Sequence, residues 1–281
     1  MAESAYTRDS AASRDEDHVL LDDVSMAYGD RPVFENLSFG FPRGKISVVL
    51  GGSGSGKTTI LKLIGGLVRP DTGRVVVEGD DVTRMKEREL YVVREKLGMM
   101  FQGGALLDSM TVFDNVAFPL RERSRRNKHE IADKVHNRLR SVGLHDVDDL
   151  LPSELSGGMV KRVALARALI LDPVIVLIDE PFSGLDPVTV KLIEALFVKI
   201  NRESGMTMIL SSHHIPTTMR MADNVIMILQ GDAIRGTPRE LARSRDARIR
   251  RFLTEEVAEE DVLERVDQLQ VEAGPSGRSG G

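Results

Sequence analysis

The chain has 281 residues, of which 41% are hydrophobic and 29% charged, a balance typical of a globular protein with one large domain and short tails. It contains no cysteine, which excludes disulfides, thiolate metal ligands and a cysteine nucleophile. A formal net charge of -5 disfavours a nucleic-acid-binding protein, so no nucleic-acid partner is expected. No apolar run approaches the roughly 18 residues of a membrane span, and no signal peptide is visible, so we expect any work at a membrane to require a partner.

The order of the predicted elements indicates an α/β protein. Residues 1–17 are polar and aperiodic, and we expect them to form a flexible arm before a domain at 18–240. Residues 103–170 are expected to be mostly helical. Strand-like runs occupy 19–21, 24–26, 33–41, 46–50, 74–77, 174–178, 206–210, 225–229 and 233–235, and helical patterns occupy 58–67, 131–142 and 188–200.

Strands that alternate with helices predict a largely parallel sheet, because parallel strands need a crossover between them. The early strands and the late hairpin at 225–235 add an antiparallel part. The segment 241–272 is expected to be a helical interaction tail, although a solvated, frayed helix is an equally good interpretation. The Gly- and Ser-rich residues 273–281 are expected to be disordered.

A glycine-rich loop follows the apolar run 46–50 and matches the pattern G-x-x-x-x-G-K-[ST]. Glycines allow backbone N–H groups to turn around a polyphosphate, and the helix that follows directs its positive end at the same charge. Lys57 can reach the β- and γ-phosphates, and Thr58 can hold Mg²⁺. The loop predicts a nucleotide-binding site formed by Gly51, Gly52, Ser53, Gly54, Ser55, Gly56, Lys57, Thr58 and Thr59.

Two carboxylates follow the buried apolar run 174–178. Because neighbouring strand residues point to opposite faces, the pair can divide two roles. Asp179 is expected to support Mg²⁺, and Glu180 to polarise the attacking water.

A second phosphate site is predicted where Ser156, Gly157 and Gly158 precede the helical segment 160–170. One domain does not need two such sites for one nucleotide. Here the chain resembles the ABC ATPase family, in which this LSGG signature closes over the γ-phosphate of the opposite subunit. The resemblance implies ATP as substrate and a second copy of the chain as partner.

Further positions match the same family. Tyr28 resembles the aromatic residue that stacks on adenine, and Gln102 the residue that senses Mg²⁺ and the membrane partner. Asp186 matches a loop that follows the two carboxylates. His213 resembles the switch histidine that contacts the γ-phosphate, although His214 beside it leaves an ambiguity of one position. The resemblance implies catalytic roles for Gln102, Glu180 and His213, and Mg²⁺ contacts from Gln102.

The resemblance covers residues 19–240 and implies a P-loop NTPase fold of the ABC ATPase type, with an antiparallel β part and a helical subdomain at about 103–170. Other P-loop classes fit less well. A kinase or GTPase would lack the signature, translation ATPases carry two cassettes in one chain, and DNA-repair ATPases insert a long coiled coil.

A finer resemblance is to ATPases of the Mla/Mce lipid-transport systems. It is carried by the segments 101–106, 111–122, 151–159 and 246–253, and Gly52 departs from the proline usual in the loop. It implies integral membrane permease subunits, an Mce-domain lipid-binding protein and, in many systems, a STAS-domain protein. The expected function is ATP-driven movement of phospholipid or a related lipid across the cell envelope, with the ATPase as a peripheral subunit at the cytoplasmic face of the inner membrane. The alternative is the ATPase of a small-solute importer.

Overall fold

The computed structural model describes residues 17–123 and 126–254. The predicted arm, apart from Asp17, lies outside the described residues. So do the predicted interaction tail from residue 255 onward and the predicted disordered end at 273–281.

A six-stranded sheet forms the centre of the fold, in the order β10-β9-β3-β8-β7-β6. All neighbouring strands are parallel except β10, which pairs antiparallel with β9. The parallel strands are buried on both faces, so they appear in the sequence as short continuous apolar runs. The strands are β3 (Ile46–Leu50), β6 (Leu97–Met100), β7 (Ile175–Asp179), β8 (Thr207–Ser212), β9 (Asn224–Leu229) and β10 (Asp232–Gly236).

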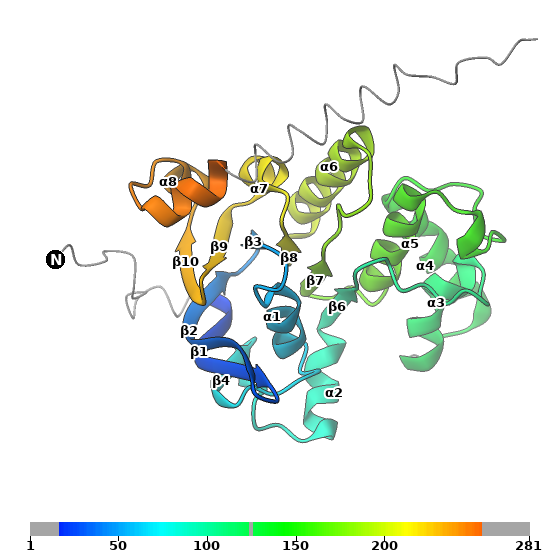
Figure 1. The fold of residues 1–281 in the computed structure, drawn as a ribbon. Coiled ribbons are helices and arrows are strands. Elements are labelled where there is room, and N and C mark those ends of the chain that lie inside the picture. The colour runs from blue at the N-terminus through cyan, green and yellow to red at the C-terminus, as the bar shows by residue number, and fades with distance from the viewer. Residues whose placement is uncertain (1–16, 124–125, 255–281) are drawn as a thin grey trace, which may run out of the picture. The chain divides into compact units, whose positions relative to one another are not determined.

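A second, antiparallel sheet has the order β2-β1-β4-β5. It is formed by β1 (Asp17–Tyr28), β2 (Arg31–Pro42), β4 (Thr72–Val77) and β5 (Asp80–Asp81). The helix α1 (Lys57–Ile64) contacts strands of both sheets, β7 and β8 on one side and β4 on the other (Figure 1). The phosphate loop therefore leads into a helix that is held by two sheets.

Helices cover the central sheet on its other face. Val48 and Val49 are neighbours on β3 but belong to different apolar clusters, because adjacent strand residues point to opposite faces. α2 (Glu87–Glu95) packs in the same apolar cluster as α1, through Leu90 and Val93. The cluster on the other face takes residues from α3 (Val112–Arg123), α4 (Lys128–Ser141), α5 (Gly157–Leu169), α6 (Pro187–Ser204) and α7 (Ile215–Met221), and the short 3₁₀ turn η2 (Pro152–Glu154) precedes α5.

The helical character predicted for 103–170 is confirmed by α3, α4 and α5, which contact one another. Ile131, Val135 and Leu139 form the buried stripe of α4, as their spacing predicts. The buried amide of Asn115 orders the loop before α3, because its Nδ2 donates to the carbonyls of Leu107, Met110 and Thr111.

The helix predicted at 58–67 ends earlier than expected. Gly65 and Gly66 stop α1 after Ile64, and Gly66 takes a left-handed φ of +62°. The backbone N–H of Leu67 then donates to the carbonyl of Lys62 at 2.8 Å, which satisfies an end of the helix. A second compact unit begins at Arg239, after the start of α8 (Pro238–Ala242), and includes the helical residues 247–254.

Candidate active site

The phosphate loop connects β3 to α1 and depends on glycine at two positions. Gly54 and Gly56 have φ values of +77° and +93°, which side chains rarely allow. A Cβ atom at Gly56 would also lie 2.7 Å from Val33 Cγ1. The loop therefore needs glycine to bring its backbone N–H groups around a ligand at the N-terminus of α1.

The hydroxyl of Ser55 lies inside this loop. Its Oγ is buried and has no hydrogen-bond partner among the described residues. A buried hydroxyl without a partner costs free energy, so an acceptor is expected there when the site is in use. A phosphate oxygen fits this requirement, and the observation supports a nucleotide in the loop.

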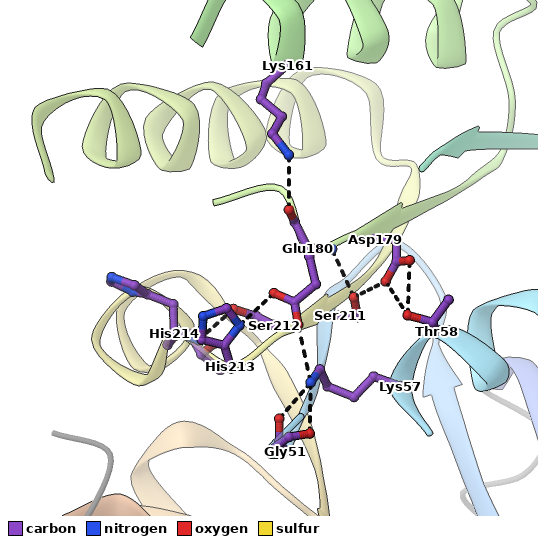
Figure 2. A network of polar contacts seen from close by, with 12 residues as sticks. Gly51, Lys57, Thr58, Lys161, Asp179, Glu180, Ser211, Ser212, His213 and His214 are labelled. Atoms are coloured by element: carbon purple, nitrogen blue, oxygen red, sulfur yellow. Dashed lines mark hydrogen bonds and ion pairs between the residues drawn. The ribbon is translucent and has the colours of Figure 1, made fainter. Parts of the chain in front are cut away.

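Lys57 is the positive centre of the site and is buried. Its Nζ donates to the carbonyls of Gly51 at 2.7 Å and Gly52 at 3.1 Å, and lies 3.2 Å from Glu180 Oε1 (Figure 2). The loop carbonyls therefore hold the ammonium beside the position where the loop would carry phosphates.

Asp179 meets Thr58 at the carboxyl end of β7. Thr58 Oγ1 donates to Asp179 Oδ1 at 3.0 Å, and Ser211 Oγ donates to the same oxygen at 2.5 Å. Ser211 is there because β7 and β8 pair in parallel with Asp179 opposite Ser211. No group of three His, Asp or Glu that could hold a metal occurs in 17–123 or 126–254. Thr58 and Asp179 nevertheless fit Mg²⁺, which commonly takes one or two protein oxygens, with phosphates and water completing its shell.

Glu180 follows Asp179 directly and stands in a left-handed conformation with a φ of +45°. One carboxylate oxygen faces Lys57, and the other lies 2.9 Å from His213 Nδ1 (Figure 2). Burial opposes ionisation of this carboxyl, but the hydrogen bond and charge of His213 and the charge of Lys57 outweigh it, so the pKa of Glu180 is below its usual value. The carboxylate is therefore ionised at neutral pH and can accept a hydrogen bond from water.

The two adjacent histidines do different things. His213 is half-exposed and reaches Glu180 from the end of β8. His214 caps α7, where its Nδ1 accepts a hydrogen bond from the backbone N–H of Thr217 at 3.3 Å. The geometry thus puts His213, and not His214, beside the carboxylate.

The predicted signature forms the start of α5. Ser156 is the N-cap residue, and its Oγ accepts from the backbone N–H of Met159 at 3.3 Å. Ser156 and Gly157 are exposed, whereas a Cβ at Gly158 would lie 2.6 Å from Thr189 Cγ2 on α6. Asp186 caps α6 and accepts from the hydroxyl of Thr189.

The structure brings together the side chains of five predicted site residues, with the carbonyls of Gly51 and Gly52 beside them. The five are Lys57, Thr58, Asp179, Glu180 and His213. Tyr28, Gln102 and Ser156 are exposed on separate elements and take no part in these contacts in the described part of the chain. The signature at the N-terminus of α5 is therefore exposed, and it does not join the contacts of Lys57 within the described residues.

Comparisons with known proteins agree with this geometry. The family model described as ABC transporter matches residues 34–183. The intermembrane phospholipid transport system ATP-binding protein MlaF of Haemophilus influenzae is 42% identical over 236 residues, which cover 84% of this chain and 89% of that protein. The chain belongs to the ABC transporter family.

A second sequence relative and a solved structure also resemble this chain. The probable ribonucleotide transport ATP-binding protein mkl of Mycobacterium tuberculosis is 40% identical over 236 residues, which cover 84% of this chain and 66% of that protein. The ATP-binding cassette MJ0796, solved as a dimer in a post-hydrolysis state with ADP and Pi, has a TM-score of 0.73 and 30% identity over 78% of this chain and 98% of its own. These findings confirm the predicted P-loop fold of the ABC ATPase type.

The chain is therefore an ABC ATPase that binds and hydrolyses ATP. The resemblance to the Mla-type ATPases is likewise confirmed at the level of sequence. Across 17–123 and 126–254, none of the helices has both the length and the apolar character needed to cross a bilayer.

Sequence reasoning missed two residues of this ABC site. Ser211 bridges the backbone of Glu180 and the carboxylate of Asp179, and parallel pairing of the runs 174–178 and 206–210 would have indicated it. Lys161 donates to the carbonyl of Glu180 at 3.2 Å. Its position five residues after Ser156 carries no motif, so nothing in the sequence pattern pointed to it.

Proposed function

We propose that this chain is the ATP-hydrolysing subunit of a transporter that moves phospholipid across the cell envelope. The observation that carries the proposal is the similarity to MlaF, a protein of an intermembrane phospholipid transport system, over 84% of this chain and 89% of the relative. The match to MlaF extends over 236 residues and so reaches beyond the residues 34–183 that the ABC transporter model matches.

In the proposed reaction, Lys57 and the backbone of residues 51–56 bind the β- and γ-phosphates. Thr58 and Asp179 hold Mg²⁺ together with those phosphates, and the ion would supply charge neutralisation. Glu180 accepts a hydrogen bond from the attacking water and orients it toward the γ-phosphorus.

His213 serves as the γ-phosphate contact, because its ring already lies beside Glu180. Gln102 joins the Mg²⁺ site from the exposed turn after β6, Tyr28 stacks on adenine, and Thr59 assists in phosphate binding. These roles rest on the family resemblance.

The complete site is proposed to need two copies of the chain. Ser156, Gly157 and Gly158 of one copy would cover the γ-phosphate held by Lys57 of the other, with Asp186 near the same boundary. The support is that the N-terminus of α5 is exposed and does not join the contacts of Lys57 within one chain. The related cassette MJ0796 is a dimer.

The proposed complex adds integral membrane permease subunits and an Mce-domain lipid-binding protein, with a STAS-domain protein as a further partner. The ATPase would then work as a peripheral subunit at the cytoplasmic face of the inner membrane. We also propose that 18–240 is the ATPase domain and that 241–272 is an interaction tail.

The substrate proposal is tested by reconstituting the purified complex in vesicles of defined phospholipid. We expect ATP turnover to change with headgroup identity, and labelled phospholipid to move in an ATP-dependent way. The Glu180→Gln complex is the control, because it should bind ATP and form dimers but neither hydrolyse nor move lipid.

The relative mkl supplies the competing outcome, since its name gives ribonucleotide transport. If deletion of the chain leaves lipid distribution normal and abolishes uptake of a polar solute such as a nucleotide, the lipid proposal is wrong. The small-solute importer then replaces it.

A further inference from the structure

The buried ammonium of Lys161 lies beside the residue that follows β7, and the proposed mechanism gives it no role. Lys161 belongs to α5 and is 5% exposed, and its Nζ donates to the backbone carbonyl of Glu180 (Figure 2). Burial lowers the pKa of Lys161, and the negative charges of Glu180 and Asp179 partly offset this. Because a buried charge is costly, its position against one particular carbonyl requires an explanation.

The carbonyl that Lys161 binds belongs to a residue with a rare backbone conformation. Glu180 has a φ of +45°, which a residue other than glycine adopts at a cost. Such conformations persist where the surroundings over-determine them, and they gather at functional sites. The backbone here decides where the carboxylate points, because the side chain starts from it.

Side chains from two other elements hold this backbone on both sides. The N–H of Glu180 donates to Ser211 Oγ at 2.9 Å, and its carbonyl accepts from Lys161 Nζ at 3.2 Å. The N–H of Ser183 also approaches the carbonyl, at a longer 3.4 Å. A charged donor makes the stronger hydrogen bond, so Lys161 is the main restraint on the carbonyl side.

We propose that Lys161 is a positioning residue for ATP hydrolysis, which holds the main chain of Glu180 so that its carboxylate faces Lys57 and His213. The proposal rests on the proposed role of Glu180. Because Lys161 lies on the helix that Ser156 begins, the same contact joins the signature helix to the catalytic carboxylate of its own chain. A shift of α5 would then move the main chain of Glu180 and, with it, the carboxylate.

The test compares two substitutions of Lys161 in the full chain within its complex. Lys161→Met removes the donor and the charge but keeps an unbranched apolar stem of similar length, so the packing of the buried stem is retained. Lys161→Arg keeps a charged donor. Lys199→Met, on the exposed face of α6, is the matched control.

We expect Lys161→Met to lower kcat about tenfold or more, the effect of losing one charge-assisted hydrogen bond. The affinity for ATP should stay within error of the wild type, because Lys161 is buried and its hydrogen bond goes to the carbonyl of Glu180 and not to the phosphate loop. The Tm should fall by no more than a few degrees, because the N–H of Ser183 still donates to that carbonyl. Lys161→Arg should recover much of kcat, and Lys199→Met should change nothing.

Three results would overturn the proposal. The first is a Lys161→Met chain with wild-type kcat. The second is a fall in kcat with a matching fall in ATP affinity, or with a Tm so low that the chain is partly unfolded at the assay temperature, because either result would make the role structural. The third is a stable Lys161→Arg chain as slow as Lys161→Met. Glu180→Gln is measured alongside to distinguish failure of the Lys161 proposal from failure of the proposed function. Wild-type turnover in Glu180→Gln would contradict the role of Glu180 itself.

Discussion

At the scale of single residues, neighbours in the sequence have different tasks. Asp179 faces Thr58 and Ser211, whereas Glu180 faces Lys57 and His213. The alternation of strand side chains begins this division, and the left-handed backbone of Glu180 completes it. Adjacent positions are thus placed for the two roles proposed above, a metal ligand at Asp179 and a water-orienting base at Glu180.

His213 and His214 offer a direct test of this division. His213→Ala should reduce kcat about a hundredfold, the usual scale for a positioned polar group at a reacting centre. His214→Ala should leave kcat near wild type and lower the stability of the fold by about 1 kcal/mol, the cost of losing a helix cap. Turnover and thermal unfolding of both variants check the assignment.

The control for the cap is His214→Asn, because asparagine is a preferred N-cap residue and should restore stability. A large loss of turnover in His214→Ala with unchanged turnover in His213→Ala would reverse the assignment.

At the scale of elements, a buried histidine joins strands from both sheets. His18 on β1 contacts Thr207 Oγ1 on β8 through Nδ1 at 2.6 Å and Glu78 after β4 through Nε2. Arg43 and Lys96 face the same carboxylate of Glu78. Burial lowers the pKa of His18 and outweighs the hydrogen bond to Glu78, which acts in the opposite direction.

This contact predicts how stability depends on pH. The folded chain binds the proton of His18 less well than the unfolded chain, whose histidine has a pKa of about 6.5. The unfolded state therefore holds more protons just below that pH, so the free energy of unfolding should fall as the pH is lowered through about 6.5 and level off above it. Urea unfolding at a series of pH values measures this.

The depressed pKa of Glu78 acts in a lower window, below its ordinary 4.5, because burial is outweighed by its contacts with Arg43 and His18. His18→Gln should remove the pH dependence around 6, and His145→Gln, at an exposed histidine, should retain it. A wild-type slope that survives in His18→Gln would contradict the prediction.

At the scale of the whole molecule, the exposed N-terminus of α5 has a consequence for mixtures of variants. Lys57→Ala damages the phosphate loop of its own chain, and Ser156→Arg damages the signature that would cover the partner's loop. In a mixed dimer both lesions fall in one composite site and the other stays intact. Random pairing makes about half of the dimers mixed, and each mixed dimer has one intact site. The mixture should therefore regain about a quarter to a half of wild-type turnover if one site suffices.

The measurement is ATP turnover of each variant alone and after mixing, at equal total protein. Recovery above both single variants supports the composite site. A mixture no more active than its components would count against it, provided that one intact site per dimer suffices for turnover.

The sequence alone determined most of the fold, because its signals are local. Buried parallel strands appear as short apolar runs, and the loop at 51–58 can be identified from its glycines and lysine. The segment between β4 and the turn after β6 was not assigned, and it contains α2 and β6. α2 buries only Leu90 and Val93, and its other apolar residues, Tyr91 and Val92, lie between them and are exposed. Its apolar residues therefore form one short run and show no helical periodicity.

The tertiary structure decided what depends on contacts between distant segments. Ser211 and Lys161 reach Glu180 because β8 and α5 pack beside β7, and no spacing along the chain records that approach. The same holds for His213 against His214, since both are histidines at the end of one strand, and one of them turns into the first turn of α7. Sequence periodicity specifies which face of an element is buried, whereas the partner of a polar side chain is set by how the elements pack together.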